Sequence, residues 1–277
     1  MATVDGRPIG VFDSGLGGLT VVRALIDLLP DEHLVYFGDT GRFPYGPKPR
    51  EEVLKYAFQI TELLMGHDVK LVVVGCNSAA AAALTELRGR YEVPLTGVIE
   101  PGLRAAAKAT RTGRIGVIGT VGTIASGAYQ RAAAQLFPGI ELACAACPGF
   151  VEFVEAGDVD SDQVFVLAER LLAPVRAAGV DTLVLGCTHY PLLARTIGDV
   201  MGPSPDGDSV VLVSSGEETA FEVAAALDAV GSRRIPQAVE GPARRRFLTS
   251  GDPATFRTLG ARFLGPEVET VEAWRWS

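Results

Sequence analysis

Two short motifs each occur twice in the chain at nearly the same separation, and this repetition constrains the fold most strongly. Ile9–Ser14 (IGVFDS) resembles Ile115–Thr120 (IGVIGT), and Val72–Asn77 (VVVGCN) resembles Thr182–Thr188 (TLVLGCT). Each half of the chain therefore supplies one apolar run that ends in Ser or Thr and one that ends in Gly-Cys. Apolar runs that end in glycine can look alike by chance, but two paired motifs with nearly one offset favour two similar domains.

Short apolar runs alternate with segments of helical period along the chain. Residues 53–64 and 164–175 place apolar side chains at helical spacing, and Ser161 or Asp162 is a candidate N-cap for the second segment. The runs expected as strands are apolar almost throughout, as is typical of strands covered on both faces. They are residues 9–12, 34–37, 71–74, 95–99, 115–118, 183–185 and 210–213. This alternation predicts an α/β architecture with largely parallel sheets.

The repeated motifs and the strand–helix alternation together predict the domain organisation. We expect two pseudo-symmetric three-layer α/β domains with mainly parallel sheets and an active site in the cleft between them. The first domain is expected to comprise residues 1–98 and 210–277, and the second residues 99–209. Gly202–Gly207 (GPSPDG) has the composition most typical of a linker.

Composition and charge exclude several classes of protein. The chain has 277 residues, of which 48% are hydrophobic, so a packed core needs no disulfide or metal to hold it together. Its formal charge of −8 gives no reason to expect bulk binding to nucleic acid or to a membrane surface. An arginine-rich stretch between Arg233 and Arg262 is read as a solvated face, with an anion or partner patch as the alternative.

The cysteine count and the first residues indicate a cytoplasmic protein. Four cysteines are too few for a secreted disulfide framework, so reduced thiols are expected. Met1–Arg7 contains no apolar stretch typical of a secretory signal, and no apolar run approaches the ~20 residues that a membrane-spanning helix needs.

Cys76 and Cys187 are the cysteines in the repeated motifs, and both follow a predicted strand. Ligands of open α/β sheets bind at the carboxyl ends of the strands. Asn77 and Ser78 follow the first cysteine and Thr188 the second, ahead of a segment with helical pattern. The N-terminus of a helix favours a thiolate and also suits a carboxylate ligand. A buried, inert cysteine is the alternative at each position, and the matched pair argues against it.

Three kinds of chemistry are open to two such thiols. They could form a disulfide, or contribute to a zinc site, although two sulfurs without close Cys or His partners make a poor one. They could also act as two bases on opposite faces of one carbon, each ~3–3.5 Å from it, which would keep the sulfurs much farther apart than a disulfide allows. One thiolate would then remove a proton and the opposite thiol would return one, which inverts the stereocentre.

Three other segments are interpreted without a chemical step of their own. Cys144 and Cys147 form a lone CxxC without ligand-spaced partners, so packing is expected rather than zinc or redox chemistry. Gly15–Gly18 follows a strand but lacks the final glycine of a dinucleotide fingerprint, because Thr20 stands there. We expect a tight turn that brings backbone close to a substrate. The Pro/Gly-bearing segment 42–50 is expected to be a lid or pocket wall, with a plain connection as the alternative.

Six segments of the chain together form a specific pattern. They are residues 8–18, 38–46, Gly75–Ser78 (GCNS), Gly97–Gly102 (GVIEPG), Gly119–Thr120 and Leu185–Leu193 (LGCTHYPLL). With these segments the chain resembles glutamate racemases of the cofactor-independent aspartate/glutamate racemase superfamily, and the resemblance extends over roughly residues 7–260. Ser78 is a departure, because the family usually carries threonine there.

The resemblance implies a role for individual residues. Cys76 would exchange the proton with the D enantiomer and Cys187 with the L enantiomer. Asp13 and His189 would help the thiol near each of them to ionise or to be reprotonated, and Glu155 matches the family's assisting glutamate. The residues implied to hold the substrate are Asp13, Ser14, Tyr45, Gly46, Asn77, Ser78, Thr120, Thr188 and His189.

The resemblance also implies the setting of the reaction. It predicts interconversion of L- and D-glutamate without cofactor or metal, for peptidoglycan and hence for cell-wall formation and cell shape. A homodimer is expected, and association with DNA gyrase is known among relatives. An aspartate racemase and a protein that senses an amino acid in the cleft are the rival functions; sensing would need no thiols.

Overall fold

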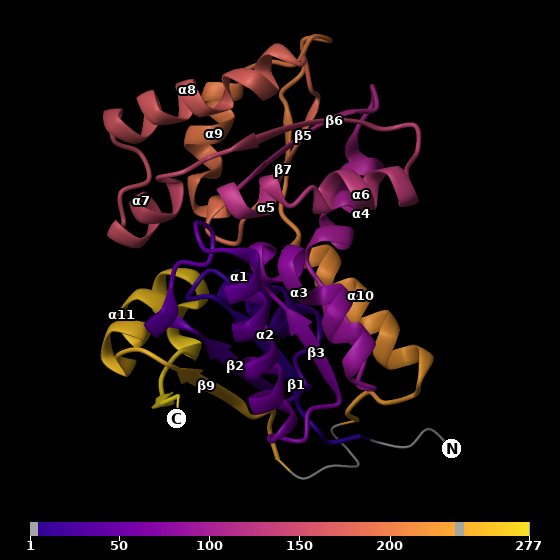
Figure 1. The fold of residues 1–277 in the computed structure, drawn as a ribbon, viewed down its shortest axis with the longest axis vertical. Coiled ribbons are helices and arrows are strands. Elements are labelled where there is room, and N and C mark those ends of the chain that lie inside the picture. Colours follow the sequence, from indigo (N-terminus) through magenta and orange to yellow (C-terminus); the bar gives the residue numbers. More distant parts are fainter. Residues whose placement is uncertain (1–4, 236–240, 277) are drawn as a thin grey trace. The chain divides into compact units, whose positions relative to one another are not determined.

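The computed structural model describes residues 5–235 and 241–276, which form two compact α/β units (Figure 1). The first unit comprises the described residues within Met1–Val98 and Gly216–Ser277, and the second comprises Ile99–Ser215. Every strand pair in the two sheets is parallel, which confirms the predicted α/β class. The expected boundary at residue 210 differs from this division, because residues 211–213 pair with a strand of the second unit.

The first unit is built on a six-stranded sheet of order β10-β9-β2-β1-β3-β4. Its central strands are fully buried, which explains their uninterrupted apolar sequences. The strands are β1 (Ile9–Asp13), β2 (Leu34–Gly38), β3 (Leu71–Val74), β4 (Leu95–Gly97), β9 (Arg245–Thr249) and β10 (Val271–Ala273).

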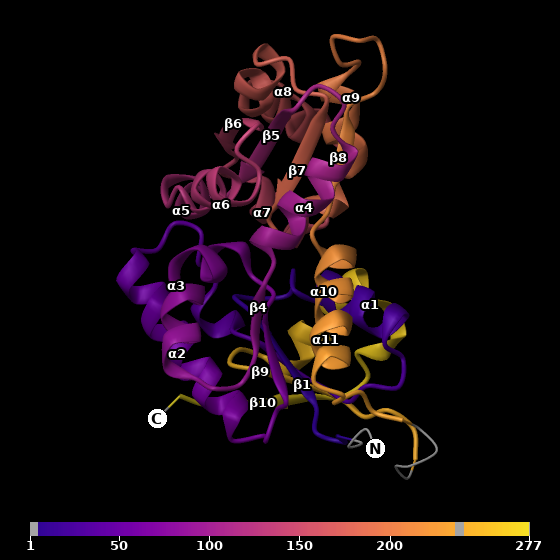
Figure 2. The ribbon, with the colours of Figure 1, turned by 90° about the vertical axis from the view of Figure 1, so that its right-hand side faces the viewer.

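Helices cover both faces of this sheet. In Figure 2, α2 and α3 lie on one side of the strands and α1, α10 and α11 on the other. These helices are α1 (Leu19–Leu28), α2 (Arg50–Met65), α3 (Asn77–Arg90), α10 (Gly216–Ala229) and α11 (Pro253–Leu264); two short 3₁₀ turns are η1 (Thr40–Arg42) and η4 (Gly265–Glu267). The helix predicted over residues 53–64 is α2, with its apolar side chains in the core.

The second unit has a four-stranded sheet of order β6-β5-β7-β8. Its strands are β5 (Arg114–Gly119), β6 (Glu141–Ala146), β7 (Thr182–Gly186) and β8 (Val211–Val213). Its helices are α4 (Ile99–Ala109), α5 (Val121–Ala125), α6 (Ala128–Leu136), α7 (Phe150–Ala156), α8 (Asp162–Ala177) and α9 (Ala194–Met201), with the 3₁₀ turn η2 (Tyr190–Leu193). Ser161 caps α8 by accepting a hydrogen bond from Val164 N, as one of the two predicted caps.

The two sheets share one topology, and this explains the repeated motifs. The order β2-β1-β3-β4 in the first unit corresponds to β6-β5-β7-β8 in the second. The repeated IGV segments form β1 and β5, and the repeated Gly-Cys segments end β3 and β7. Because β1 pairs with β3 and β5 with β7, each unit brings the ends of its two repeated motifs together.

Gly202–Gly207 is not a linker between the units. It lies between α9 and β8 inside the second unit, where Pro203 forms an isolated bridge with Ser209. The glycines and prolines therefore shape a local turn. Within the two described stretches of the chain, no helix combines the length and apolarity needed to cross a membrane.

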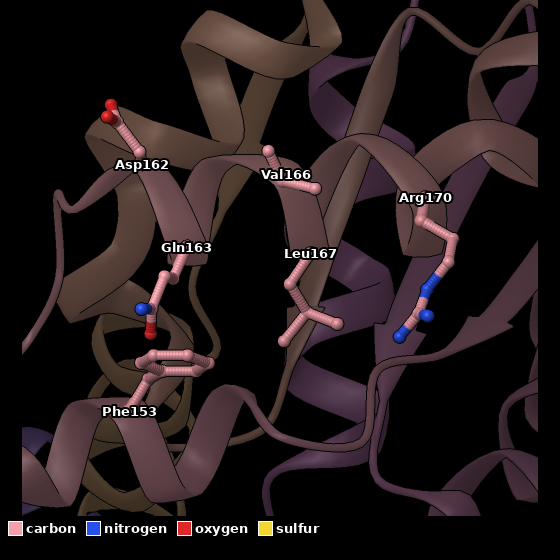
Figure 3. Close-up of a pocket in the computed structure, with 6 residues that line it drawn as sticks. All are labelled: Phe153, Asp162, Gln163, Val166, Leu167 and Arg170. Atoms are coloured by element: carbon pink, nitrogen blue, oxygen red, sulfur yellow. The ribbon is translucent and has the colours of Figure 1, made fainter.

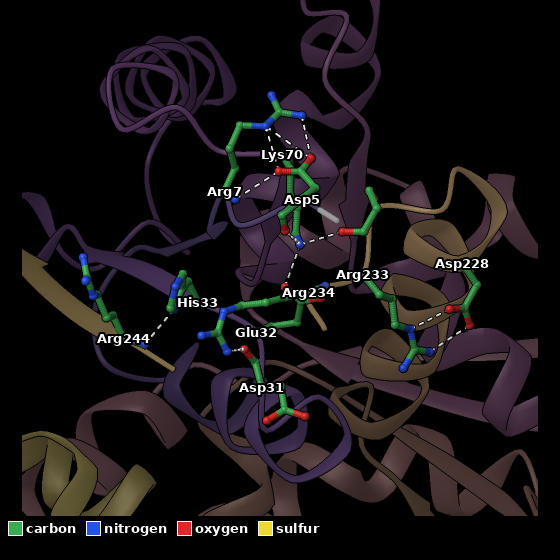
Figure 4. Close-up of polar contacts among 11 residues, drawn as sticks. Asp5, Arg7, Asp31, Glu32, His33, Lys70, Asp228, Arg233, Arg234 and Arg244 are labelled. Atoms are coloured by element: carbon green, nitrogen blue, oxygen red, sulfur yellow. Dashed lines mark hydrogen bonds and ion pairs between the residues drawn. The ribbon is translucent and has the colours of Figure 1, made fainter. Parts of the chain in front are cut away.

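A buried ion pair closes the amino-terminal edge of the first sheet. Lys70 Nζ lies 2.7 Å from Glu32 Oε2 and also donates hydrogen bonds to the backbone carbonyls of Asp5 and Ser232 (Figure 4). The backbone N–H of Arg234 donates to the other oxygen of Glu32. A buried pair is tolerated when further hydrogen bonds satisfy both charges, as they do here. The charges of Lys70 and Glu32 therefore stabilise the fold, and they lie away from the carboxyl ends of the strands.

Candidate active site

The carboxyl ends of β1, β2 and β3 carry the polar residues of the first unit. Asp13 ends β1, Asp39 follows β2, and Cys76 comes two residues after β3. All three are buried. In a parallel sheet these ends share one edge, so three elements far apart in sequence deliver two carboxyl groups and a thiol to one place.

Cys76 forms the N-cap of α3 and is 5% exposed. Its Sγ lies 3.6 Å from Ser14 Oγ, which in turn lies 3.5 Å from Asp13 Oδ1. Burial and the charge of Asp13 raise the pKa of the Cys76 thiol to about 12, although hydrogen bonds from Ala79 and Ser14 act in the opposite direction. The backbone N–H of Ala79 at the start of α3 favours the Cys76 thiolate, as expected, but burial and the neighbouring carboxylate outweigh it.

The glycine-rich segment after β1 forms the tight turn that the sequence predicted. Gly15 N donates a 2.7 Å hydrogen bond to Asp13 Oδ1, and Tyr36 Oη donates to the carbonyl of Gly15. A Cβ on Gly18 would lie 2.5 Å from Asp13 Cβ, so no larger residue fits without a shift. The turn thus lets backbone approach the Asp13 carboxylate closely.

Tyr45 is buried beside the same edge of the sheet. Its hydroxyl donates to Asp39 Oδ2, and burial and the Asp39 charge raise the pKa of Tyr45. The segment around Tyr45 therefore packs into the first unit and is more than a plain connection. Gly46 is buried next to it. Sequence reasoning assigned no role to Asp39, although its position directly after a buried strand could have pointed to it.

Asn77 and Ser78 occupy the first turn of α3 and are both buried. Their backbone N–H groups belong to the first turn of the helix, where N–H groups point away from the carbonyl groups of the helix itself. This part of the site is therefore suited to an anion such as a carboxylate.

The second unit supplies the other thiol. Cys187 comes directly after β7 and is 7% exposed, and its Sγ lies 3.9 Å from His189 Nδ1. His189 Nε2 lies 2.8 Å from Glu155 Oε1 on α7. The structure thus joins thiol, imidazole and carboxylate in one chain of contacts, with the carboxylate contributed by a separate helix.

The segment after Cys187 differs from the expected helix start. Residues 187–189 form a turn, and the 3₁₀ turn η2 begins at Tyr190 before α9. Pro191 is the second residue of η2; it has no N–H to donate and suits the opening of a helical turn. Tyr190 N donates to the carbonyl of Cys187, so backbone still closes around the cysteine.

Thr120 and Thr188 lie at the carboxyl ends of β5 and β7. Thr120 caps α5, since its Oγ1 accepts a hydrogen bond from Thr123 N, and Thr188 is buried directly after Cys187.

Sequence reasoning missed Tyr129. Burial and the charge of Cys187 raise the pKa of the Tyr129 hydroxyl. A Cβ on Gly186 would lie 3.1 Å from the Tyr129 hydroxyl, so that glycine makes room for the ring.

The remaining cysteines belong to the packing of the second unit. Cys144 lies on β6 and is half-buried, and Cys147 is fully buried just after that strand. Burial raises the pKa of Cys147 to about 12 and that of Cys144 to about 11. Tyr190 Oη donates a 3.0 Å hydrogen bond to the carbonyl of Cys147.

A surface pocket of about 530 Å³ lies between α7 and α8, and Phe153, Gln163 and Leu167 point into it (Figure 3). Asp162, Val166 and Arg170 complete the described lining. The expected site residues are not among these, so this pocket is separate from the Cys187 cluster even though α7 also carries Glu155.

The chain is similar in sequence to known proteins over most of its length. The sequence model of a family described as Asp/Glu/Hydantoin racemase matches residues 9–220. A glutamate racemase from Parafrankia sp. is 53% identical over 268 residues, which is 97% of this chain and 94% of the relative.

Solved structures of glutamate racemases are also similar to this chain. A glutamate racemase isoform from Bacillus anthracis superposes with a TM-score of 0.89 at 40% identity, covering 98% of this chain and 97% of that one. A glutamate racemase from Francisella tularensis, solved in complex with D-glutamate, gives 0.88 at 32% identity and covers 98% of both chains. These matches run almost the whole length of the sequence, and the chain belongs to the Asp/Glu/Hydantoin racemase family.

Proposed function

We propose that this protein is a cofactor-independent glutamate racemase in which Cys76 and Cys187 move the Cα proton. The observation that carries the proposal is the pair of buried cysteines at the carboxyl ends of the topologically equivalent strands β3 and β7. Relatives over nearly the full length are glutamate racemases. The product D-glutamate would serve peptidoglycan synthesis and thereby the cell wall and cell shape.

In the direction from L- to D-glutamate, the Cys187 thiolate takes the Cα proton and becomes a thiol. The electron pair of the broken C–H bond stays on the substrate as a carbanion. The Cys76 thiol then gives its proton to the opposite face of that carbon and becomes the thiolate. The reverse reaction exchanges the two roles. Each sulfur must come within ~3–3.5 Å of the Cα, so the substrate has to reach both cysteines at once.

The surroundings of each thiol support these roles. The raised pKa of Cys76 keeps it as a thiol at neutral pH, which is the form that donates a proton to the carbanion. At Cys187, the contact with His189 provides a group that can accept or return the thiol proton, and Glu155 can stabilise a positively charged imidazole. Each acid or base is expected to contribute ~10²–10⁴-fold, so substrate positioning and exclusion of water must supply the rest of the rate.

Binding of the zwitterion is assigned to the groups around the two thiols. The first turn of α3, with Asn77 and Ser78, suits one carboxylate, and the hydroxyls of Thr120 and Thr188 suit a carboxylate as well. The Asp13 carboxylate is a partner for the substrate ammonium. Ser14, Tyr45, Gly46 and His189 complete the set proposed to hold glutamate.

Deuterium exchange at Cα tests the proposal. Purified, metal-free protein in heavy water is expected to exchange the Cα proton of both L- and D-glutamate and to bring either enantiomer to the racemic mixture. Aspartate under the same conditions is the control, since the family description also includes aspartate racemases. Exchange of neither glutamate enantiomer would sink the proposal, and preference for aspartate would reassign the substrate.

Three further parts of the proposal rest on resemblance to relatives. The protein acts in the cytoplasm, it forms a homodimer, and it associates with DNA gyrase. Sedimentation at several protein concentrations tests the dimer, and a pull-down with purified gyrase tests the association. A concentration-independent monomer and the absence of gyrase binding are the respective contrary outcomes.

A further inference from the structure

The segment that follows β10 runs to the edge of the sheet where the candidate site lies. β10 pairs in parallel with β9, and Trp274 N continues this pairing with a 2.7 Å hydrogen bond to the carbonyl of Thr249. Because every strand of this sheet points the same way, the residues beyond β10 emerge beside the carboxyl ends of β9 and β2. Trp276 is thereby placed near residues that follow β2.

Trp276 contacts two residues of the segment that follows β2. Its indole Nε1 donates a 3.2 Å hydrogen bond to Asp39 Oδ1, and the Arg42 guanidinium carbon lies 3.9 Å from the centre of its ring. The ring also meets Phe37, at the end of β2, edge to face with 5.4 Å between centroids. The indole therefore fits against the strand end while it binds both a carboxylate and a cation.

Asp39 in turn holds Tyr45, which is one of the residues expected to bind substrate, and Arg42 holds Asp39. Asp39 Oδ2 accepts from the Tyr45 hydroxyl and, at 2.7 Å, from Arg42 Nε. The Arg42 guanidinium lies between two rings, because Tyr56 faces it at 4.0 Å on α2. Asp39 N also donates to the carbonyl of Asp13. The same small network thus reaches Tyr45 by a side chain and Asp13 by backbone.

The Arg42 guanidinium lies between two aromatic rings, and the Asp39 carboxylate accepts several hydrogen bonds. Both arrangements restrict the positions of the side chains that take part. Loss of one face would release the Arg42 side chain, and loss of the indole N–H would remove one donor from Asp39. Neither change touches a group that exchanges a proton in the proposed reaction. The consequence should therefore fall on how well the substrate-binding segment is ordered before glutamate arrives, which appears in binding more than in the chemical step.

We infer that Trp276 is a positioning residue for glutamate binding, which orders segment 39–46 through Asp39 and Arg42. The inference deepens the proposed function and depends on it for its kinetic part. The segment after β10 would then have a role in the site, and no sequence motif indicated that role.

Kinetics of three variants test the inference. Trp276→Ala is expected to raise KM for glutamate about fivefold or more, with kcat within about twofold, from the loss of a cation–π contact and a hydrogen bond. Trp276→Phe keeps an aromatic face for Arg42 and should recover part of the KM. Trp274→Ala is the matched control, because Trp274 is 38% exposed and contacts the backbone of Thr249 and the ring of Trp276. An unchanged KM in Trp276→Ala, or an equal rise in the control, would overturn the inference.

Trypsin cleavage gives a second readout that needs no racemase activity. Arg42 precedes Phe43, so its peptide bond is a trypsin site inside the segment, whereas Lys48 is followed by Pro49 and resists cleavage. Cleavage after Arg42 should be about fivefold faster in Trp276→Ala than in the wild type or in Trp274→Ala. If the wild type fails to racemise glutamate while this difference appears, the proposed function fails and the ordering role stands. If racemisation is normal and neither KM nor cleavage changes, the ordering role fails alone.

Discussion

His189 Nε2 lies 2.8 Å from Glu155 Oε1, although the two residues come from separate segments of the second unit. His189 follows β7, and Glu155 lies on α7. The opposite ring nitrogen of His189 faces the Cys187 sulfur at 3.9 Å. A carboxylate, an imidazole and a thiol therefore form a series in which the carboxylate orients the ring.

Glu155→Gln tests this series. The amide keeps the shape of the side chain but removes the charge that would stabilise a protonated imidazole, so we expect kcat to fall about 10-fold with little change in KM. Steady-state rates in both directions measure the effect. Glu152→Gln, on the exposed part of the same helix, is the control and should leave kcat unchanged. Equal kcat values for Glu155→Gln and the wild type would remove Glu155 from the mechanism.

Cysteine substitutions separate the two pairs of thiols. Cys76→Ser and Cys187→Ser should each lower the rate of racemisation by at least ~10²-fold, because a hydroxyl is a far weaker acid and base at neutral pH. Cys144→Ser, at a half-buried position on β6, should keep nearly full activity. Optical rotation follows the conversion of each enantiomer. Full activity of either Cys76→Ser or Cys187→Ser would refute a mechanism with two thiols.

The raised pKa of Cys76 predicts how its alkylation depends on pH. The thiolate is the reacting species, and with a pKa near 12 its fraction grows about tenfold per pH unit through the neutral and mildly alkaline range. In a variant whose other three cysteines are serine, the rate of reaction with iodoacetamide should rise without a plateau up to pH 10. A plateau at or below pH 9 would contradict the raised value.

Asp13→Asn tests the cause of that shift in the same three-serine variant. The Asp13 charge disfavours a second negative charge on Cys76, so its removal should move the alkylation profile to lower pH. The asparagine oxygen can still accept the hydrogen bond from Gly15 N, which keeps the turn in place. An unchanged profile would mean that burial alone sets the pKa of Cys76.

Most of the fold could be predicted from the sequence because buried parallel strands have a distinctive pattern. The seven apolar runs mark strands whose two faces are covered, and the repeated Gly-Cys motif reflects the shared order of the two sheets. β6 escaped prediction because Glu141–Ala146 is an edge strand of mostly small residues, with little of the β-branched sequence that marks its neighbours. β10 is short and mostly exposed, so its sequence carries almost no strand signal.

The candidate site could be predicted only where residues lie next to a motif or match a family pattern. Cys76, Cys187 and His189 fall in such segments, whereas Trp276 reaches Asp39 only through the pairing of β9 with β2 and β10. Long-range pairing of this kind depends on the whole sheet and leaves no local signature. The pKa of Cys76 likewise depends on burial and on Asp13, which the residues adjacent to Cys76 in the sequence do not reveal.

Asp181 is expected to stabilise the second unit in a pH-dependent manner. Its buried carboxylate accepts hydrogen bonds from Thr110 Oγ1 at 2.6 Å and from the N–H groups of Arg111 and Thr112 at 2.7 Å. Burial alone would raise the pKa of Asp181, but these hydrogen bonds outweigh it and hold the pKa below its ordinary value. Asp181→Asn removes the charge and turns an N–H₂ group toward the donors, which should cost about 1–3 kcal/mol in the free energy of unfolding at pH 7.

The difference in the free energy of unfolding between the wild type and Asp181→Asn should shrink in acid. A carboxyl group with a depressed pKa in the folded state contributes its full stability above the unfolded value, which is 3.8 here, and loses it as the pH falls toward the folded value. Urea unfolding at pH 7, 5 and 3 should therefore show a gap that is constant between pH 7 and 5 and narrows at pH 3. Asp160→Asn, at an exposed position before α8, is the control and should match the wild type throughout. A gap that stays constant down to pH 3 would show that Asp181 acts through its shape and not through its charge.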